Sequence, residues 1–286
     1  MNEKKIPVTE RNNPRTLNID KYDTMEILRT IHLEDIRAYE AVGCQLKKIS
    51  EIVDKIYKKF SEGGRVIYVG AGTSGRLGAQ DAIEMWPTYG FGKDKFDYVI
   101  AGGDEALKRS IENAEDIEDD AIRALKEKNI KKNDSILGIS ASGLTPFVYS
   151  ALKFAKSEGA YTVAIVNNEE SPMINIVDDY IILDTGEEVI QGSTRLKAGT
   201  SQKMVLNMIS TTIAIKSGRT IGNEMLYMKA FYNNKLKKRA LNLLKKRYDI
   251  NINEIKNLLE KNNYNLLIVI NELEKLTQNR KNNIMK

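Results

Sequence analysis

The chain has 286 residues, of which 42% are hydrophobic and 29% are charged, and its net charge at pH 7 is +5. This balance indicates an ordinary globular protein of one or two domains. The single cysteine, Cys44, and the single histidine, His32, exclude an internal disulfide, a cysteine zinc site and a three-histidine metal site. Lysines are spread along the chain, so the positive charge does not by itself predict nucleic-acid binding.

The N-terminal part of the chain is polar at first and then helical. Residues 1–7 are charged and lack the apolar core of a signal peptide, and no apolar run anywhere approaches the roughly 18 residues of a membrane span. We therefore expect a cytoplasmic protein. From Thr24 to about Phe60 apolar residues recur at helical spacing, which predicts two helices ending before Gly63. Residues 1–60 are expected to form a helical segment that packs on the next domain.

A glycine-rich turn follows the first predicted strand, the apolar and β-rich run 66–69. Within this turn, Gly72 allows a close approach to the backbone, while Thr73 and Ser74 supply hydroxyl donors. The helix that begins here and is expected to stop at Pro87 adds free N–H groups and the positive end of its dipole. Together these features predict an anion site.

The glycine pattern of this turn leaves the ligand open. Gly70, Gly72 and Gly75 also match the dinucleotide fingerprint, which requires an acidic residue about 20 positions on, after the second strand. The second strand covers about 96–101, and the first acid after it is Asp104, which is rather late. A tight turn without a ligand is a further alternative. The two hydroxyls favour a lone phosphate over both.

Strands and helices then alternate along the chain, which predicts a doubly wound parallel sheet of five strands. Asp104 is expected to cap a helix that runs to Glu115, and loop 185–194 precedes a long helix from Arg195 to Lys216. Residues 61–220 would form this α/β domain, and residues 221–286 a small C-terminal helical bundle. The remaining predicted elements are a helix at 118–128, strands at 135–139, 161–166 and 180–183, and a helix at 147–157.

A second hydroxyl-rich turn, Ser140–Pro146, follows the third strand. Because the carboxyl ends of parallel strands meet at one edge of a sheet, this turn and the first are expected to face the same ligand. The hydroxyls that would reach it belong to Thr73, Ser74, Ser140, Ser142 and Thr145. Serines in turns often only cap helices, but two such turns favour a phosphorylated small molecule.

Two glutamates stand near the predicted ends of the two helices that follow the first and second strands, Glu84 and Glu115. They could be ordinary surface residues. Beside a bound sugar phosphate, however, two carboxylates can divide the work of a general acid and a general base, one protonated and the other ionised.

Several stretches carry a resemblance to a known family. In chain order they are Val69–Gly78, Ile100–Gly103, Ala114–Asp116, Ser142–Pro146 and Gly192–Thr200. They resemble the N-acetylmuramic acid 6-phosphate etherases, sugar isomerase (SIS) domain enzymes of bacterial cell-wall recycling. The similarity extends from Asn13 to at least Asn223, and the stretch beginning at Gly192 is the most specific.

The resemblance implies a cytoplasmic homodimer that cleaves the D-lactyl ether of N-acetylmuramate 6-phosphate. The products would be N-acetylglucosamine 6-phosphate and D-lactate. The implied mechanism opens the sugar ring, removes the proton next to the aldehyde, expels lactate from C3 and then adds water. It needs no cofactor, neither metal nor nucleotide. The implied partners are the sugar phosphate and a second copy of the chain, with no nucleic acid and no membrane.

The resemblance also implies roles for particular residues. Glu84 falls on the family's proton-donor position, and Glu115 on its second catalytic glutamate. The residues expected to bind the substrate or its phosphate are Gly72, Thr73, Ser74, Ser140, Ser142, Gly143, Thr145, Glu188, Ser193 and Lys197. The chain departs from the family at Leu144, usually an arginine, and at 167–170 and 223–228, which bears on affinity and substrate choice.

Two other classes of function fit the same stretches. A non-catalytic sugar-phosphate sensor, like the SIS-domain glucokinase regulatory protein, resembles them too, although that regulator is longer and has two such domains. A sugar-phosphate isomerase of the same fold is the other alternative. A SIS transcription regulator would need a helix-turn-helix with a basic recognition helix, and residues 24–60 show no clear one.

Overall fold

The computed structural model describes residues 6–226 and 234–284. Backbone contacts divide the chain into two compact units. The first comprises residues 1–83 and 92–213, and the second comprises residues 84–91 and 214–286. The division into segments 1–60, 61–220 and 221–286 stays a prediction from the sequence.

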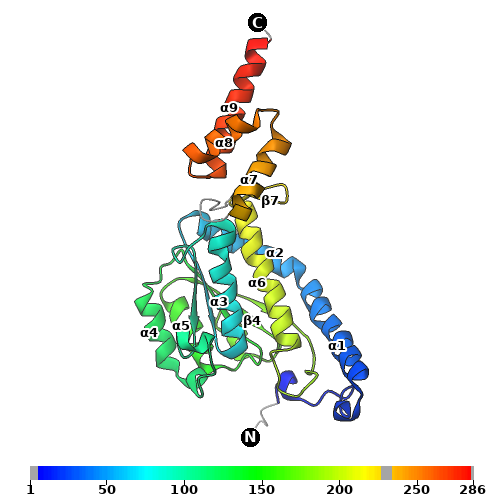
Figure 1. The fold of residues 1–286 in the computed structure, drawn as a ribbon. Coiled ribbons are helices and arrows are strands. Elements are labelled where there is room, and N and C mark those ends of the chain that lie inside the picture. The colour runs from blue at the N-terminus through cyan, green and yellow to red at the C-terminus, as the bar shows by residue number, and fades with distance from the viewer. Residues whose placement is uncertain (1–5, 227–233, 285–286) are drawn as a thin grey trace. The chain divides into compact units, whose positions relative to one another are not determined.

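A parallel sheet of five strands forms the centre of the first unit (Figure 1). Its strand order is β2-β1-β3-β4-β5, so the chain starts near one edge, turns back and then winds to the other edge. The three central strands, β1, β3 and β4, are entirely buried, as expected of a parallel sheet covered on both faces. The predicted doubly wound fold is confirmed. The strands are β1 (Val66–Gly70), β2 (Phe96–Ile100), β3 (Ser135–Ser140), β4 (Tyr161–Val166) and β5 (Asp179–Ile182).

Alternate residues of β1 show how helices cover both faces of the sheet. Ile67 and Val69 belong to a core cluster shared with helices α4 (Glu118–Glu127) and α5 (Pro146–Ser157). Tyr68 points to the other face, where its hydroxyl donates a 2.8 Å hydrogen bond to Asp81 of α3 (Gly72–Tyr89). Asp81 in turn accepts a bond of 2.8 Å from Asn207 of α6 (Lys197–Lys216). The buried carboxylate therefore joins two helices to the sheet.

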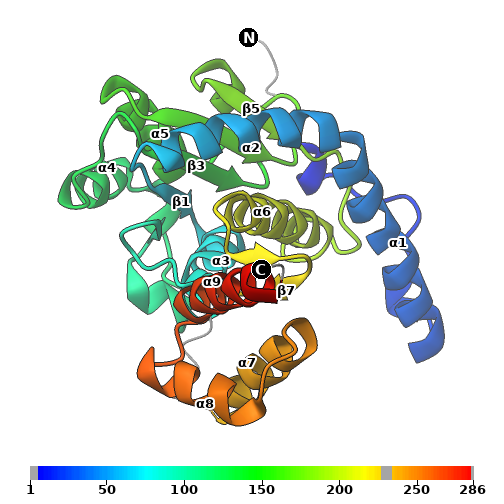
Figure 2. The same cartoon turned by 90° about the horizontal axis from the view of Figure 1, so that it is seen from above.

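The two predicted N-terminal helices are α1 (Thr24–Cys44) and α2 (Leu46–Ser61). A capping box begins α1, since Asp23 accepts from the N–H of Glu26, whose own side chain accepts from the N–H of Asp23. Helix α2 buries an apolar face and lies across the sheet, in contact with β3 and β5 (Figure 2). Asp179 of β5 fixes this contact through ion pairs with Lys48 and Lys55, at 2.5 and 2.6 Å.

One predicted helix boundary and one predicted helix are wrong. Helix α3 does not stop at Pro87 but continues to Tyr89, because a proline near the end of a helix removes only one hydrogen bond. The single helix predicted from Asp104 to Glu115 is absent. Two one-turn 3-10 helices, Asp104–Leu107 and Ala114–Asp116, stand in its place. Asn113 between them has φ of +60°, a left-handed conformation that no α-helix accommodates.

The second unit contains a short hairpin and three helices around a core of its own. The hairpin consists of β6 (Thr220–Ile221) and β7 (Glu224–Met225). Leucine, isoleucine and valine side chains from the three helices fill the core, which confirms the predicted C-terminal bundle. Part of the predicted connection before it, residues 227–233, lies outside the described residues. The helices are α7 (Asn234–Arg247), α8 (Ile252–Lys261) and α9 (Leu266–Ile284).

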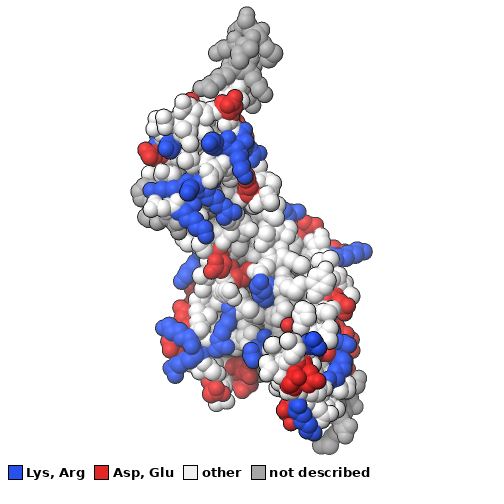
Figure 3. Space-filling view, turned by 45° about the vertical axis from the view of Figure 1, so that its right-hand side comes forward, with Lys and Arg blue, Asp and Glu red and all other residues white. Residues whose placement is uncertain are grey.

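Basic side chains are concentrated on α7, whose sequence contains seven lysines and arginines and no acidic residue. On the face drawn in Figure 3, basic side chains (blue) accordingly predominate over the second unit. Basic and acidic side chains are interspersed over the first unit. The lysine-rich end of the sequence therefore accounts for much of the net positive charge. None of the helices within 6–226 and 234–284 is long and apolar enough to cross a membrane.

Candidate functional site

The two hydroxyl-rich turns lie side by side at the carboxyl edge of the sheet. Strands β1 and β3 are direct neighbours, and Gly70 at the end of β1 is in register with Ile139, one residue before the end of β3. Helix α3 starts two residues after β1, and helix α5 starts six residues after β3. Both turns therefore present helix N-termini, with their unpaired N–H groups, at the same edge.

In the first turn, the backbone of helix α3 at Gly75 packs closely against the backbone of Gly70 at the end of β1. A Cβ atom on Gly75 would lie 2.7 Å from the carbonyl oxygen of Gly70, so no other residue fits this position. Gly72 has φ of +52°, and no heavy atom lies within 4 Å of where its Cβ would be. The backbone at Gly72 is thus open to a ligand, while Gly75 provides the close packing.

Ser74 is buried and belongs to a chain of hydrogen bonds directed into the protein. Its hydroxyl donates to the Gln202 amide oxygen at 2.8 Å, and the Gln202 amide nitrogen donates to Asn167 at 2.9 Å. Asn167 then donates to Ser201 at 3.0 Å. Thr73, by contrast, is only partly buried. The two hydroxyls of this turn therefore differ, since the Ser74 proton is already engaged by helix α6.

The second turn is held in shape by its own side chains. The hydroxyl oxygens of Ser140 and Thr145 lie 2.8 Å apart, and Ser140 also accepts from the N–H of Gly143 at 3.0 Å. Ser142 accepts from the N–H of Leu144 at 3.2 Å. The turn is therefore braced by its own hydrogen bonds, and the side chain of Leu144 at its tip is exposed.

Glu115 and the first turn line one pocket of about 140 Å³. The pocket also contains Gly72, Arg76, Ser110 and Asn113, so a carboxylate, a cation and the open backbone at Gly72 meet in it. The sequence did not single out Arg76 as a functional residue, although it stands inside the first family-like stretch. The structure thus places one of the two predicted catalytic glutamates beside the predicted anion site.

Glu84 is exposed near the C-terminal end of α3. It belongs to residues 84–91, which group with the second unit, whereas Glu115 belongs to the first. Its pairing with Glu115 therefore stays a prediction.

Of the predicted site residues in the 185–197 region, Glu188 and Lys197 are buried and engaged inside the protein. Glu188 is fully buried and accepts from the N–H groups of Lys197 and Ala198 at 3.0 and 2.9 Å, so it caps helix α6. Burial raises the pKa of Glu188, while these two N–H groups oppose the rise. Ser193 is partly exposed, and its N–H donates to the carbonyl of Ile190 at 2.9 Å. A role of Glu188, Ser193 and Lys197 in binding stays a prediction.

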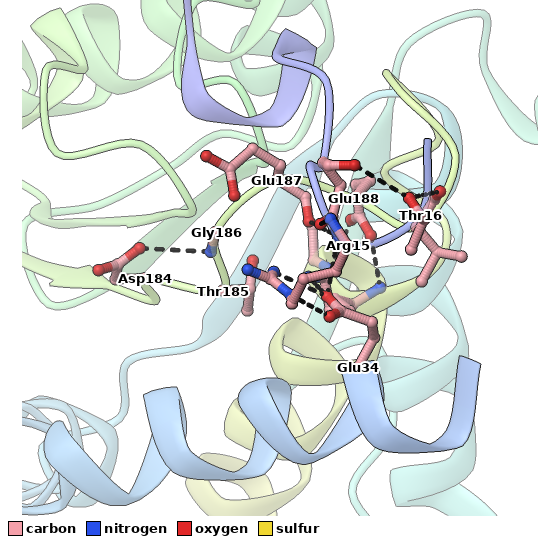
Figure 4. A network of polar contacts seen from close by, with 12 residues as sticks. Arg15, Thr16, Glu34, Asp184, Thr185, Gly186, Glu187 and Glu188 are labelled. Atoms are coloured by element: carbon pink, nitrogen blue, oxygen red, sulfur yellow. Dashed lines mark hydrogen bonds and ion pairs between the residues drawn. The ribbon is translucent and has the colours of Figure 1, made fainter. Parts of the chain in front are cut away.

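Lys197 is fully buried and forms an ion pair with Glu34 of α1 at 2.5 Å. Glu34 also accepts from Arg15 at 2.5 Å and from Asn13 at 3.0 Å, as Figure 4 shows for the surrounding network. Burial alone would raise the pKa of Glu34, but the hydrogen bonds from Arg15 and Lys197 lower it to about 2. The ionised carboxylate therefore holds the N-terminal segment, α1 and α6 together.

We predict that Glu34→Gln destabilises the protein near neutral pH by about 3–5 kcal/mol, because Lys197 would stay buried without its counter-charge. The folded-state pKa of about 2 lies below the ordinary value of 4.5, so this stabilisation is complete above pH 4.5 and disappears as the pH falls through 2. Urea unfolding of both proteins near neutral pH and near pH 2 measures the difference.

The exposed Glu40 on the same helix provides the control, since Glu40→Gln is expected to change stability little at either pH. A deficit of Glu34→Gln that stays constant between the two pH values would contradict the role given to the ionised carboxylate.

We also predict that Gly143→Ala destabilises the second turn by about 1–3 kcal/mol. Gly143 has φ of +68°, and a Cβ atom there would lie 2.3 Å from the Ser171 side chain. Gly43 in α1 is the matched control, because a Cβ there would meet nothing within 4 Å. Thermal unfolding should show a loss for Gly143→Ala and no loss for Gly43→Ala. Equal melting temperatures for the two variants would exclude the strain.

Comparisons with known proteins define the class. Residues 48–156 match the family model of the glucokinase regulatory protein N-terminal SIS domain, and residues 107–211 match the SIS domain model. The phosphoheptose isomerase GmhA from Neisseria gonorrhoeae is similar in fold, with a TM-score of 0.52 and 17% identity over 66% of this chain and 97% of that chain. The protein c3406 of E. coli CFT073 has a TM-score of 0.50 and 17% identity over 70% of this chain and 95% of that chain. The chain is a SIS-domain protein.

Curated relatives narrow the class to one enzyme family. The N-acetylmuramic acid 6-phosphate etherase of Clostridium beijerinckii is 45% identical over 92% of this chain and 86% of its own length. The etherase of Lactobacillus gasseri is 44% identical over 92% of this chain and 88% of its own length. The chain belongs to the N-acetylmuramic acid 6-phosphate etherase family, which confirms the resemblance seen in the sequence.

Proposed function

We propose that this chain cleaves the D-lactyl ether of N-acetylmuramate 6-phosphate by elimination and hydration, as a cytoplasmic enzyme. The observation that carries the proposal is the pocket in which Glu115 meets the open backbone of Gly72 at the start of α3. A carboxylate that acts at C2 of a sugar must lie within the length of that sugar from the group that anchors the phosphate on C6. The high identity to etherases supports the choice of this reaction over others of the same fold.

The phosphate of the substrate is proposed to bind between the two turns. Thr73 and the N-terminus of α3 would contact it from one side, and Ser142, Thr145 and the N-terminus of α5 from the other. The phosphoheptose isomerase of the same fold is named for a phosphorylated sugar, which supports a ligand of this class. Because the second turn is already ordered by the contact of Ser140 with Thr145, binding would require little rearrangement.

The proposed chemistry uses the open-chain sugar. A carboxylate, for which Glu115 is the candidate, removes the proton at C2. The C3–O bond then breaks, and its electron pair leaves with the lactyl oxygen. A second group, for which Glu84 is the candidate, protonates that oxygen so that D-lactate leaves. Water then adds to C3 of the unsaturated aldehyde, and a proton returns to C2. The atoms balance as one water consumed for each ether cleaved.

Reaction in heavy water enriched in oxygen-18 should put deuterium at C2 and oxygen-18 at C3 of the N-acetylglucosamine 6-phosphate. The label follows because a solvent proton must return to C2 and the new C3 oxygen must come from water. Mass spectrometry of both products measures the label. Oxygen-18 in the lactate instead would mean that the bond on the lactyl side breaks, and the mechanism would be wrong.

Replacing either glutamate by glutamine tests the two candidates. Each of Glu84→Gln and Glu115→Gln should reduce the rate of D-lactate release by roughly 10²–10⁴, the usual contribution of a general acid or base. Glu127→Gln on α4, also exposed, is the control and should keep full activity. Full activity of Glu84→Gln would remove Glu84 from the mechanism without affecting the etherase proposal. Wild-type protein that releases no D-lactate would instead favour a sensor or an isomerase.

We further propose that two copies of the chain associate through α1. Large apolar side chains are exposed along this helix, with fractional exposures of 55–70% for Met25, Leu28, Leu33 and Tyr39. A soluble protein rarely leaves so many apolar groups on one helix without a partner. A second copy is the natural occupant, since most soluble oligomers pair identical surfaces.

Light scattering at micromolar concentration should therefore give twice the chain mass of 32.3 kDa. Exchanging Leu28 and Tyr39 for glutamate should shift the mass toward one chain, because each charge would be buried in the proposed contact. Exchanging the exposed Ile252 of α8 for glutamate should leave the mass unchanged. A single-chain mass for the unaltered protein would contradict the association.

A further inference from the structure

Arg76 connects helix α3 to the segment that carries Glu115. It lies in the second turn of α3, four residues after Gly72, and the residue is partly buried. The Nε atom donates to the carbonyl of Ala106 at 2.8 Å, and Nη2 donates to the carbonyl of Arg109 at 3.2 Å. Both carbonyls belong to the segment between β2 and Glu115, so the arginine bridges two parts of the pocket.

The segment from 101 to 116 has little regular structure of its own. It contains two one-turn helices, and backbone conformations with positive φ occur at Gly102, Gly103 and Asn113. Its buried anchors are small, namely Ala101, Ala106 and Ala114. A segment whose helices are single turns depends on outside donors to keep one conformation. Arg76 supplies two such donors.

An arginine suits this task better than a lysine. Its guanidinium is planar and presents several N–H groups in a fixed arrangement, so it can satisfy two carbonyls at once and fix the distance between them. A lysine ammonium is a single flexible point that would satisfy one carbonyl well. Because Ala106 and Arg109 stand three residues apart, the guanidinium holds both ends of a full turn of the segment.

We propose that Arg76 is a positioning residue that holds the Glu115 carboxylate in its catalytic position relative to the first turn. This inference rests on the proposed function, because it assigns Glu115 the chemical step. Helix α3 would thus do two things at once. Its N-terminus faces the phosphate, and its second turn fixes the carboxylate that acts on the same sugar.

The test compares the kinetics of Arg76→Met and Arg76→Lys with the wild-type enzyme, using N-acetylmuramate 6-phosphate and D-lactate release. A misplaced catalytic group lowers the rate of chemistry by up to about 10²-fold, so kcat of Arg76→Met should fall on that scale while KM changes by less than about threefold. Arg76→Lys should recover part of the loss. Arg123→Met, which removes an exposed arginine of α4, should behave as wild type.

Combining the change with Glu115→Gln separates positioning from other roles. If Arg76 acts through Glu115, then Arg76→Met should cost little once Glu115 is glutamine, because the two residues act as one unit. Losses that multiply would overturn the proposal. A raised KM with unchanged kcat would also overturn it, by making Arg76 a residue that binds the substrate directly.

Two further outcomes are distinguishable. If the wild-type protein releases no D-lactate, the proposed function fails rather than the role of Arg76. If Arg76→Met does not fold, as judged by circular dichroism and thermal unfolding, Arg76→Lys decides by the same split between kcat and KM. A folded Arg76→Lys with wild-type kcat and KM would show that the two-carbonyl bridge is dispensable and would overturn the proposal.

Discussion

The buried ion pair between Glu34 and Lys197 is the contact on which the arrangement of the first unit depends. It joins α1 to the start of α6, and Arg15 and Asn13 add the N-terminal segment to the same carboxylate. Two charges taken out of water are costly unless each has a partner and good hydrogen bonds. Because this carboxylate accepts from three side chains, the pair specifies one arrangement of elements that lie far apart in the sequence.

The position of helix α6 in turn determines how the first hydroxyl-rich turn is held at the carboxyl edge of the sheet. The start of α6 is fixed at Lys197 and capped by Glu188, so the following turns of the helix are in place to meet the first hydroxyl-rich turn. Gln202 makes that contact with Ser74. The ion pair therefore fixes helix α6, and helix α6 in turn fixes the glycine-rich turn through the contact of Gln202 with Ser74.

Much of this could be predicted from the sequence, and the physical reasons are local. The strands are short apolar runs, and the turns after β1 and β3 have glycine or hydroxyl residues whose conformational preferences are strong. Topology then places two neighbouring turns at one edge without further information. The placement of Glu115 near Gly72 did not follow from the predicted elements, because the helix expected from Asp104 would have carried Glu115 away from this edge, whereas two one-turn helices keep it there.

The errors arise where distant contacts decide local structure. The segment 104–115 has helical apolar spacing, but Asn113 adopts a left-handed conformation and Arg76 holds two carbonyls that a helix would have used internally. The partner of Lys197 could not be read from the sequence, since Glu34 stands 163 residues away from it. A signal for Gln202 did exist, because it is a polar residue among the buried apolar positions of α6.

The chain of hydrogen bonds from Ser74 has a direction, and this gives the first turn a polarity. Every donor points the same way, from Ser74 through Gln202 and Asn167 to Ser201, which donates at 2.8 Å to the carbonyl of Ala198. Ser74 consequently offers only lone pairs to the space beside it, whereas the backbone N–H groups of the helix start offer protons. The protons that this turn can offer to an anion are therefore those of the backbone N–H groups at the start of α3 and of the Thr73 hydroxyl, and not that of Ser74.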